Sequence, residues 1–156
     1  MTLRLEPLPR WRAGEVLHLA LAPGQEAFVG RIEQMVAEAR ESVELHAIQG
    51  GAEAVGFFKI DRDYGQDSGF AGPGDTGLRG MLIGAQYQGR GYGRAALTAL
   101  PDYLRATYPE LGLVRLTVNT ANTRALGLYL ATGWRDTGEL WHGHRSGPQH
   151  ILALDL

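Results

Sequence analysis

The chain has 156 residues, of which 44% are hydrophobic, and a formal net charge of −2. This length predicts one domain over residues 1–156, and the near-neutral charge argues against a nucleic-acid partner. The chain contains no cysteine, which excludes disulfides, thiolate metal sites and a cysteine nucleophile. No apolar run approaches the roughly 20 residues of a membrane span, and the first residues lack the apolar stretch of a signal peptide. We therefore expect a cytoplasmic protein without a membrane partner.

The first half of the chain is predicted to combine short helices with an antiparallel strand pair. Apolar residues recur at three- and four-residue steps between residues 25 and 42, which predicts a helix. Gly50-Gly51 is predicted to be a hairpin turn. The predicted elements are a strand at 2–6, a short helix at 11–21, a helix at 25–42, and strands at 43–49 and 54–60.

Residues 61–79 show no hydrophobic periodicity. The segment holds five glycines, one proline and four aspartates. A connection of this length is uncommon in a compact domain and is either mobile or functional. Its acidic side chains would suit a cationic acceptor, although keeping a flexible loop soluble is the favoured explanation for them. These side chains are Asp61, Asp63, Asp67 and Asp75.

The second half of the chain alternates strands with helices. Pro101 interrupts the first of these helices and predicts a kink, because its missing N–H leaves the Leu97 carbonyl without a helical partner. The mixed order of elements predicts an α/β fold with helices on both faces of a mixed sheet. The predicted elements are strands at 78–85 and 114–118, helices at 91–108 and 123–132, and a closing antiparallel pair at 134–141 and 149–154. The side chains of Leu97, Leu100 and Leu104 are expected to face the core.

A glycine-rich turn, Gln88-Gly89-Arg90-Gly91-Tyr92-Gly93, joins the strand at 78–85 to the following helix. The first N–H groups of a helix have no partner within it, and the helix dipole makes that end electropositive. Glycines at 89, 91 and 93 lack the Cβ atoms that would keep an anion from these groups. The turn therefore predicts a phosphate site without a metal, and an ordinary strand-to-helix turn is the alternative.

Two commoner phosphate motifs do not fit this turn. A Walker loop requires a lysine and then serine or threonine after its second glycine, but Arg90 and Gly91 follow Gly89. A dinucleotide fingerprint that starts at Gly89 requires a glycine at position 94, where the chain has Arg94.

A later segment argues against an ordinary turn. The strand at 114–118 leads into Asn119-Thr120-Ala121-Asn122 and then into the helix at 123–132. Asn122 and Tyr129 are two turns apart, so they can lie on one helix face about 10 Å apart along the axis. Gly133 stands where a left-handed helix stop is expected.

Together the two segments resemble the GNAT superfamily of acyl-coenzyme A N-acyltransferases. The family pattern Gln-x-x-Gly-x-Gly is met by Gln88, Gly91 and Gly93. The pattern Asn-x-x-Ala-x-x-Leu-Tyr-x-x-x-Gly-Trp is met by Asn122, Ala125, Leu128, Tyr129, Gly133 and Trp134. The resemblance covers nearly the whole chain, and residues 134–139 are similar, more weakly, to the polyamine acetyltransferase branch.

The resemblance implies a single-domain GNAT-like fold, α/β or α+β in class. Its central sheet would be mixed and mostly antiparallel, with helices on both faces and a splayed parallel strand pair at 78–85 and 114–118. The pantetheine arm of the cofactor would enter the gap between those two strands. The implied activity is transfer of an acetyl group from acetyl-CoA, without a metal, to a primary amine of a small molecule by direct attack in a ternary complex. Homodimers are frequent in the family, and the apolar C-terminal strand could support one.

The resemblance also implies which residues bind the cofactor. Backbone N–H groups from Gly89 to Arg94 would hold the pyrophosphate. The strand segment Met81 to Ile83 would pair with pantetheine through its backbone while its side chains pack. Asn122 could cap the helix, contact pantetheine, or do both. The full expected set is Met81, Leu82, Ile83, Gln88, Gly89, Arg90, Gly91, Tyr92, Gly93, Arg94, Asn122 and Tyr129.

Tyr129 is the implied catalytic residue, as a general acid toward the leaving thiolate, and a core aromatic is the alternative. Its unperturbed pKa near 10 lies above that of a thiol, from which we expect proton donation to be downhill. The general base stays open. Some family members carry a glutamate at the position of Thr117, which cannot serve, so the candidates are Glu44, His46, Asp75 or a relayed water.

Three histidines near the end of the chain, His142, His144 and His150, suggest a metal site. No further metal-site spacing accompanies them, so solvated hairpin histidines are favoured, and lining the acceptor pocket is a third interpretation. Rival functions for the whole chain are a non-catalytic acyl-CoA sensor, an acetyltransferase of a peptide N-terminal amine, and another kind of nucleotide-phosphate binder.

Overall fold

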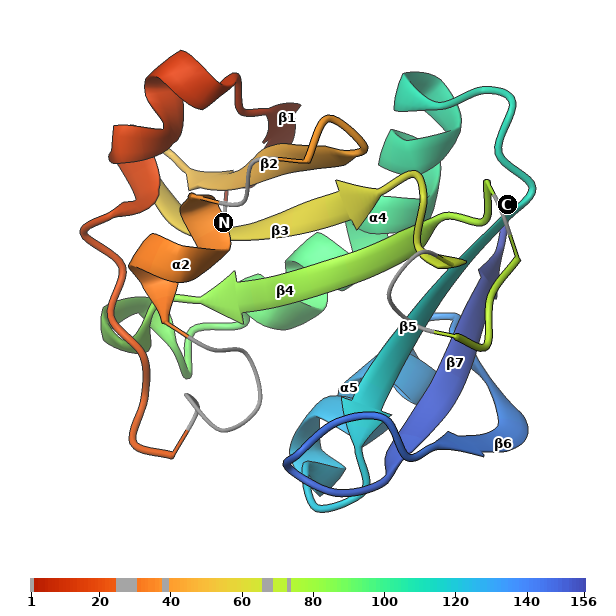
Figure 1. Cartoon of the computed structure of the whole chain (residues 1–156). Helices are drawn as coiled ribbons and strands as arrows, with labels where there is room; N and C mark the ends of the chain where they lie inside the picture. The colour runs from red at the N-terminus through yellow and green to blue at the C-terminus, as the bar shows by residue number, and fades with distance from the viewer. Residues whose placement is uncertain (1, 25–30, 38–39, 66–68, 73) are drawn as a thin grey trace.

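A seven-stranded sheet forms the centre of the computed structural model, with the strand order β1-β2-β3-β4-β5-β7-β6 (Figure 1). The structure describes residues 2–24, 31–37, 40–65, 69–72 and 74–156. The strands are β1 (Arg4–Pro7), β2 (Val43–Gly50), β3 (Glu53–Asp61), β4 (Gly77–Ile83), β5 (Leu113–Asn119), β6 (Arg135–Trp141) and β7 (Gln149–Asp155). Neighbouring strands run antiparallel except β4 and β5, which run parallel. The expected mixed, mostly antiparallel sheet is confirmed.

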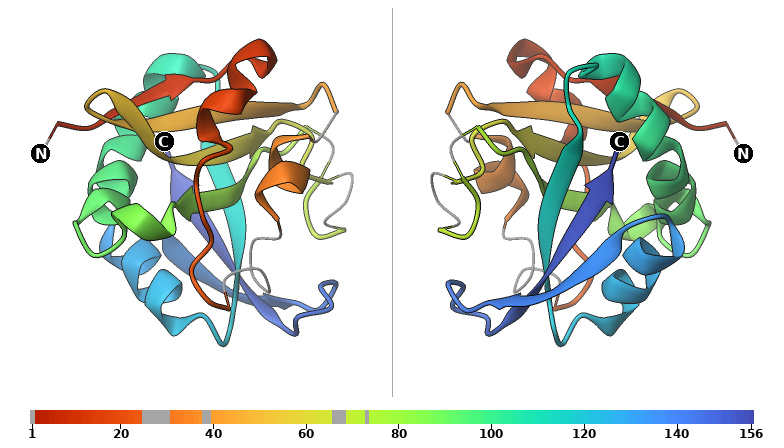
Figure 2. Two further views of the ribbon diagram at one scale, coloured as in Figure 1. Left: turned by 90° about the vertical axis from the view of Figure 1, so that its left-hand side faces the viewer. Right: turned by 90° about the vertical axis from the view of Figure 1, so that its right-hand side faces the viewer.

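Helices cover both faces of this sheet, as expected. Figure 2 shows α4 and α5 on one side and α2 on the other. The helical elements are η1 (Arg10–Val16), α2 (Ile32–Val36), η2 (Ala85–Tyr87), α4 (Tyr92–Thr107) and α5 (Thr123–Ala131). No helix among the described residues is long and apolar enough to cross a bilayer.

Two helix predictions in the first half differ from the structure. Residues 10–16 form a 3-10 helix, so the short helix predicted at 11–21 is present but ends earlier than predicted, at Val16. Gly14 lies inside this stretch, and glycine disfavours an α-helix. The helix predicted at 25–42 is limited to Ile32–Val36 among the described residues, since residues 25–30 and 38–39 lie outside them.

The hairpin between β2 and β3 turns one residue later than predicted. Gly50 pairs with Glu53, which leaves Gly51 and Ala52 as the two turn residues. Gly51 has φ of +81°, a conformation that glycine adopts without steric cost.

The core packs α4 against the sheet. Leu97, Leu100 and Leu104 are buried, as their spacing predicted, against a sheet whose Phe57 and Phe58 are fully buried. Each such leucine contributes roughly 1.5–3 kcal/mol by leaving water. Pro101 lies inside α4, and the helix continues past it to Thr107. This packing fixes the start of α4 beside the end of β4.

Candidate active site

The strands β4 and β5 diverge after a single rung, which confirms the expected splayed parallel pair. Gly77 pairs with Arg115, and no other register pair joins these two fully described strands. A register shift opposite β3, between Phe57 and Lys59, places an extra residue in β4 near Gly80, whose φ is +62°. A bulge of this kind bends its strand. It therefore turns the second half of β4 away from β5.

The divergence leaves one backbone edge of β4 without a strand partner in the part of the chain that the structure describes. Leu82 turns its carbonyl toward β3, since a Cβ atom on Gly56 would lie 2.3 Å from that oxygen. Because successive residues of a strand point their polar groups to opposite sides, Met81 and Ile83 direct theirs toward β5. The Ile83 carbonyl accepts a hydrogen bond from Gln88 Nε2 at 2.8 Å. Of the three predicted strand contacts, the geometry therefore favours the backbones of Met81 and Ile83 over that of Leu82.

The glycine turn places the start of α4 beside that edge. Gly89 and Gly91 have φ of +78° and +84°, so both need the left-handed conformation that glycine tolerates. Gly91 is the N-cap of α4, and its carbonyl accepts the first hydrogen bond of the helix from Ala95 N–H at 3.0 Å. The N–H groups of residues 92–94 have no partner one turn back, as at any helix start. At Gly93 a Cβ atom would meet Ile83 and Leu128 at 3.6 Å, an ordinary van der Waals distance, so this residue shows that the start of α4 lies close to β4 and α5.

Charged and aromatic side chains surround the turn. Arg90 and Arg94 are exposed, and the guanidinium of Arg90 lies 6.0 Å from the centre of the Tyr87 ring. Tyr92 packs edge-on against Tyr87, with ring centres 6.4 Å apart, and over Gly50. Gln88, through its bond to Ile83, ties the turn to β4. The two arginines are thus the side chains here that are best placed to meet an anion.

Asn122 and Tyr129 lie on α5 as their spacing predicted. Asn122 caps the helix, and its Oδ1 accepts from Ala125 N–H at 3.3 Å. Gly133 ends the helix region with φ of +104°. Trp134 follows, buried, with its ring 5.7 Å from the half-buried ring of Tyr129 in an edge-to-face contact. The motif residues therefore fix the direction of the Tyr129 side chain.

The pKa of Tyr129 is raised above its ordinary value, first by burial and then by the nearby Tyr64 phenol. A group with a higher pKa holds its proton more tightly, so a phenol does not transfer a proton downhill to a thiolate. The expectation of downhill transfer is therefore wrong. The raised pKa keeps the phenol protonated, as a hydrogen-bond donor requires.

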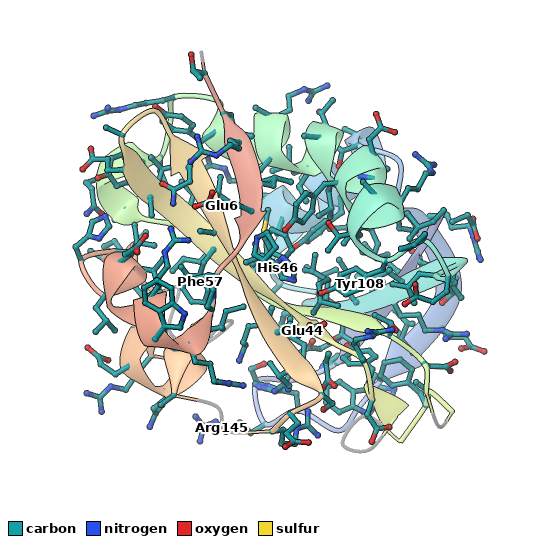
Figure 3. All side chains as sticks on the ribbon, turned by 90° about the horizontal axis from the view of Figure 1, so that it is seen from above. Glu6, Glu44, His46, Phe57, Tyr108 and Arg145 are labelled. Atoms are coloured by element: carbon teal, nitrogen blue, oxygen red, sulfur yellow. The ribbon has the colours of Figure 1, made fainter. Side chains whose placement is uncertain are left out.

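Two candidate bases, Glu44 and His46, lie away from the divergence. His46 is 1% exposed, and its Nδ1 and Nε2 lie 2.6 and 2.8 Å from the hydroxyls of Tyr103 and Tyr108. The Tyr108 hydroxyl donates to Glu44 Oε1 at 2.8 Å, and Figure 3 shows Glu44, His46 and Tyr108 side by side. β2 lies two strands from β4, about 10 Å at the usual strand spacing. Neither residue is placed to receive a proton from a substrate there.

The acids of the connection after β3 have structural partners. Asp61 is buried and pairs with Arg40 and Arg79. The carboxylate of Asp75 accepts from Arg115 at 3.0 Å and from the N–H of Gly72 at 2.7 Å. Keeping a loop soluble is therefore the wrong explanation for Asp61, which is buried, whereas Asp75 is partly exposed and is held by its arginine. Asp67 lies outside the described residues.

The three histidines do not form a cluster. His144 Nδ1 accepts from Ser146 N–H at 3.0 Å, His150 lies 3.8 Å from Asp136, and His142 is exposed. Among the residues that the structure describes, no group of three histidine or carboxylate side chains is placed to hold a metal ion.

Two further residues at the divergence escaped the sequence analysis. The side chain of Asn119, at the end of β5, donates to the carbonyl and hydroxyl oxygens of Ser146 at 3.0 and 2.9 Å, which ties the β6–β7 hairpin to β5. Tyr64 is buried beside Gly77 and interacts with Thr117. Asn119 could have been found from the sequence, because a polar side chain at the end of a predicted strand is a candidate site residue. Tyr64 could not, because it lies in a segment without periodicity.

Comparison with known proteins agrees with this geometry. The model of the acetyltransferase (GNAT) family matches residues 12–134. A curated relative, an uncharacterized N-acetyltransferase YbbJ of Bacillus subtilis (strain 168), is 32% identical over 71 residues. That match covers 46% of this chain and 42% of the relative, so it spans less than half of either protein.

Solved acetyltransferase structures share the fold over nearly the whole chain. Aminoglycoside acetyltransferase AAC(6')-Ib, solved with coenzyme A and kanamycin, superposes with a TM-score of 0.77 at 18% identity, covering 99% of this chain and 95% of that one. A spermidine N-acetyltransferase SpeG chimera from Vibrio cholerae and hSSAT gives 0.70 at 17%, covering 99% and 96%. The ribosomal-protein-S18-alanine N-acetyltransferase from Escherichia coli gives 0.68 at 16%, covering 99% and 94%. With the family model matching most of its length, the chain belongs to the acetyltransferase (GNAT) family.

Proposed function

We propose that the protein is an N-acetyltransferase that moves the acetyl group of acetyl-CoA to a primary amine of a small molecule in a ternary complex. One observation carries the proposal: the open backbone edge of β4 and the glycine-capped start of α4 lie together at the divergence of β4 and β5, and the Tyr129 phenol is within electrostatic reach of Tyr64, whose ring lies against Gly77 there. These are the parts that would hold a pantetheine amide, a diphosphate and a leaving sulfur.

The diphosphate would be held by the N–H groups from Gly89 to Arg94. A helix start offers both free donors and a positive dipole end, and the left-handed glycines let the anion approach the backbone. Arg90 and Arg94 would add charge at the exposed rim. The backbones of Met81 and Ile83 would pair with the pantetheine arm, and Asn122 would combine its cap with a contact to that arm.

The reaction needs a neutral amine and a polarised carbonyl. The amine nitrogen attacks the thioester carbon, the C–N bond forms, and the C–S bond breaks; the nitrogen loses one proton to water and the sulfur gains one. A backbone N–H of β4 would stabilise the oxyanion. Tyr129 would donate a hydrogen bond to the sulfur as negative charge grows there and would pass its proton to the sulfur as the C–S bond opens; water returns a proton to the phenol, so the proton that the nitrogen loses balances the one that the sulfur gains. The products are the N-acetylated amine and free coenzyme A.

The acceptor is proposed as a small primary amine. The similar proteins are named for an aminoglycoside, spermidine and an alanine of ribosomal protein S18, and all three names describe amine acceptors. In this chain the carboxylates of Asp61 and Asp75 already bind arginines, which does not favour a polycation over a monoamine.

A second copy of the chain is proposed as a partner. The C-terminal strand β7, which was expected to support a dimer, is buried between β5 and β6 and offers no edge. β6 is instead an edge strand of the sheet, and its surface is largely exposed, including Leu140 at 47%. Such an edge can pair with another strand. Sedimentation of the protein at micromolar concentration would show a dimer, and a monomer at all concentrations would refute this part.

The test of the activity is a thermal-shift and acyl-transfer screen. Coenzyme A should stabilise the protein more than ATP or NAD, and thiol should be released from acetyl-CoA in the presence of one or more amine classes: monoamines, polyamines, aminoglycosides and peptides. Equal or greater stabilisation by ATP or NAD would contradict cofactor recognition. Coenzyme A binding without turnover of any amine would instead identify a non-catalytic sensor.

A further inference from the structure

A cavity of about 540 Å³ lies outside the divergence of β4 and β5, between the stretch that follows β1, the start of β2 and the end of α4. Glu44, His46 and Tyr108, which Figure 3 shows side by side, are among the residues that line it. The described residues around it include none from β4, β5 or α5. Pockets for small molecules commonly enclose about 300–1,000 Å³, so this cavity has room for a ligand of its own.

The cavity forms where β1 separates from β2. β1 pairs with β2 as far as Pro7, whose partner is His46. Pro9 has no N–H to offer a sheet, and the chain turns into η1 at the next residue. Arg10 then reaches back, and its guanidinium donates to the Val43 carbonyl at 3.0 Å. Beside the first residue of β2, a side chain therefore stands where a strand would lie, and this leaves the space next to it open.

The buried polar groups of the cavity already have partners. Strand alternation places Glu44 and His46 on the same face of β2, and the Tyr108 hydroxyl lies 2.8 Å from both Glu44 Oε1 and His46 Nε2. His46 and Tyr108 are buried, whereas Glu44 is exposed. A carboxylate has about four acceptor positions, of which Tyr108 uses one. Glu44 can therefore accept from a further donor without disturbing the network behind it.

The cavity presents negative charge to a ligand. Three carboxylates and two guanidinium groups line it, those of Glu41, Glu44, Glu110, Arg10 and Arg62. Both arginines are engaged with the protein, because Arg62 pairs with Glu110 and Arg10 donates to backbone carbonyls. Among the described residues, neither Glu41 nor Glu44 forms an ion pair. These two carboxylates therefore remain for a cation from outside the chain.

The remaining walls favour an organic cation over a metal ion. Ca²⁺ binds about six to eight oxygen atoms, and no group of three histidine or carboxylate side chains among the described residues is placed to hold a metal. The Tyr108 ring already faces a cation, since the guanidinium of Arg62 lies 5.1 Å from its centre. Apolar residues complete the lining, and three of them are buried: Leu8, Val43 and Leu45. An alkylammonium ion matches both features, because it combines three N–H donors with an apolar chain.

We propose that this cavity binds a small primary alkylammonium ion, with its nitrogen held by the carboxylates of Glu44 and Glu41 and its alkyl chain against the apolar wall. The inference goes beyond acetyl transfer and does not rest on it, because binding here needs neither acetyl-CoA nor a covalent step. The described lining of the cavity shares no residue with the divergence, so the cation bound here is not the amine that is acetylated.

The test is a titration of the ¹⁵N-labelled protein with n-butylammonium chloride, followed by amide chemical shifts in the absence of acetyl-CoA. Saturable shifts are expected at residues 43–46 and 107–110. Glu44→Gln removes the charge and keeps an acceptor for Tyr108, so it should raise the Kd about three- to tenfold, as expected for one partly exposed ion pair. Glu139→Gln makes the same change at an exposed position of β6 and should leave the Kd unchanged. Sodium butyrate, with the opposite charge, should not shift these amides.

Each other outcome overturns the inference. Absence of shifts at residues 43–46 and 107–110 would show that the cavity does not take the cation. Equal shifts with butyrate would show that charge does not select the ligand, and equal shifts with MgCl₂ at the same ionic strength would identify a metal site or simple screening.

An unchanged Kd in Glu44→Gln would remove the assigned carboxylate. Should that variant fail to fold, Glu41→Gln, at an exposed position, must weaken binding instead, and a wild-type Kd there would refute the inference equally. A protein that acetylates no amine would overturn the proposed function alone, since this titration contains no acetyl-CoA. A protein that acetylates amines but shows no shifts around the cavity would overturn this inference alone.

Discussion

The tyrosines around His46 and those at the divergence of β4 and β5 are alike in burial and opposite in what surrounds them. Around His46 the polar groups form hydrogen bonds with one another. Tyr108 donates to Glu44, so it accepts from His46 Nε2–H, and the remaining nitrogen accepts from Tyr103. Burial raises the pKa of Tyr103 to about 12 and that of Tyr108 further still.

At the divergence, burial also raises the pKa of Tyr64 and Tyr129, but these phenols lie beside a backbone edge that no strand covers. A raised pKa therefore identifies a buried phenol in both places and does not by itself distinguish a packed network from a site. The unpaired strand edge next to a helix start makes that distinction, because, apart from the Ile83 carbonyl that accepts from Gln88, its backbone groups face no strand among the described residues.

The strongest test of this contrast is Tyr129→Phe. Removing a general acid typically costs 10²–10⁴ in rate, so kcat should fall at least about 100-fold while the Kd for coenzyme A changes less than about twofold. Steady-state thiol release and calorimetry give the two values. Equal loss of turnover and binding would show that the Tyr129 hydroxyl holds the cofactor and has no role toward the sulfur.

The His46 network should show itself in stability and not in activity. Burial lowers the pKa of His46 to about 4, so the unfolded state, with a pKa near 6.5, binds a proton first as the pH falls. The contribution of His46 to the free energy of unfolding is therefore fully present above about pH 7. It declines between about pH 6.5 and pH 4 and does not change further at lower pH. Linkage gives a loss of about 2 kcal/mol between pH 7 and pH 5.

Urea titrations of wild type and His46→Gln at the two pH values check this prediction. The variant should lose about one proton's worth of the pH dependence and keep wild-type kcat/KM below its melting temperature. An unchanged pH dependence would mean that His46 titrates normally, and a specific loss of kcat would connect the network to the site.

A matched pair of glycine variants separates the effect of the turn on cofactor binding from the effect of backbone strain on stability. Gly91→Ala and Gly138→Ala place a side chain at φ of +84° and +82°, each costing about 1–2 kcal/mol of stability. Only Gly91→Ala also places a Cβ where the diphosphate is proposed to bind. We expect its Kd for coenzyme A to rise about tenfold or more, for a further cost of about 1.4 kcal/mol, and that of Gly138→Ala to stay unchanged. Equal affinities in a fluorescence titration would place the phosphates elsewhere.

The smallest expected effect belongs to Arg90 and Arg94. Both are exposed, and exposed charge pairs contribute about 0.2–1 kcal/mol. Arg90→Gln should weaken coenzyme A binding by about two- to fivefold at low salt, and less at 0.5 M salt because exposed charges are screened. A loss that does not depend on salt would indicate a buried contact instead.

Local patterns predicted the parts of the site that local sequence builds. The glycine turn, the Asn122 cap and the Gly133 stop each depend on residues within one or two helical turns. Hydrophobic periodicity likewise placed Leu97, Leu100 and Leu104 in the core. The parallel pair and its divergence came from the family resemblance, since no local pattern encodes a missing ladder.

Long-range contacts account for what the sequence did not reveal. Asp61 and Asp75 seemed to be loop acids because their partners, Arg40, Arg79 and Arg115, lie between 18 and 40 residues away. Tyr64 was overlooked because its ring reaches the divergence only when its segment of the chain folds back over Gly77. His46 was considered as a base because its enclosure by Tyr103 of α4 and by Tyr108, just after that helix, cannot be read from β2 alone.

A crystal structure of the complex with coenzyme A tests the central claim most directly. The account predicts that the diphosphate oxygens accept hydrogen bonds from the N–H groups of residues 89–94, and that the pantetheine arm runs along the edge of Met81 and Ile83 with its sulfur beside the Tyr129 hydroxyl. A diphosphate bound away from the start of α4, or a sulfur that does not reach Tyr129, would contradict it.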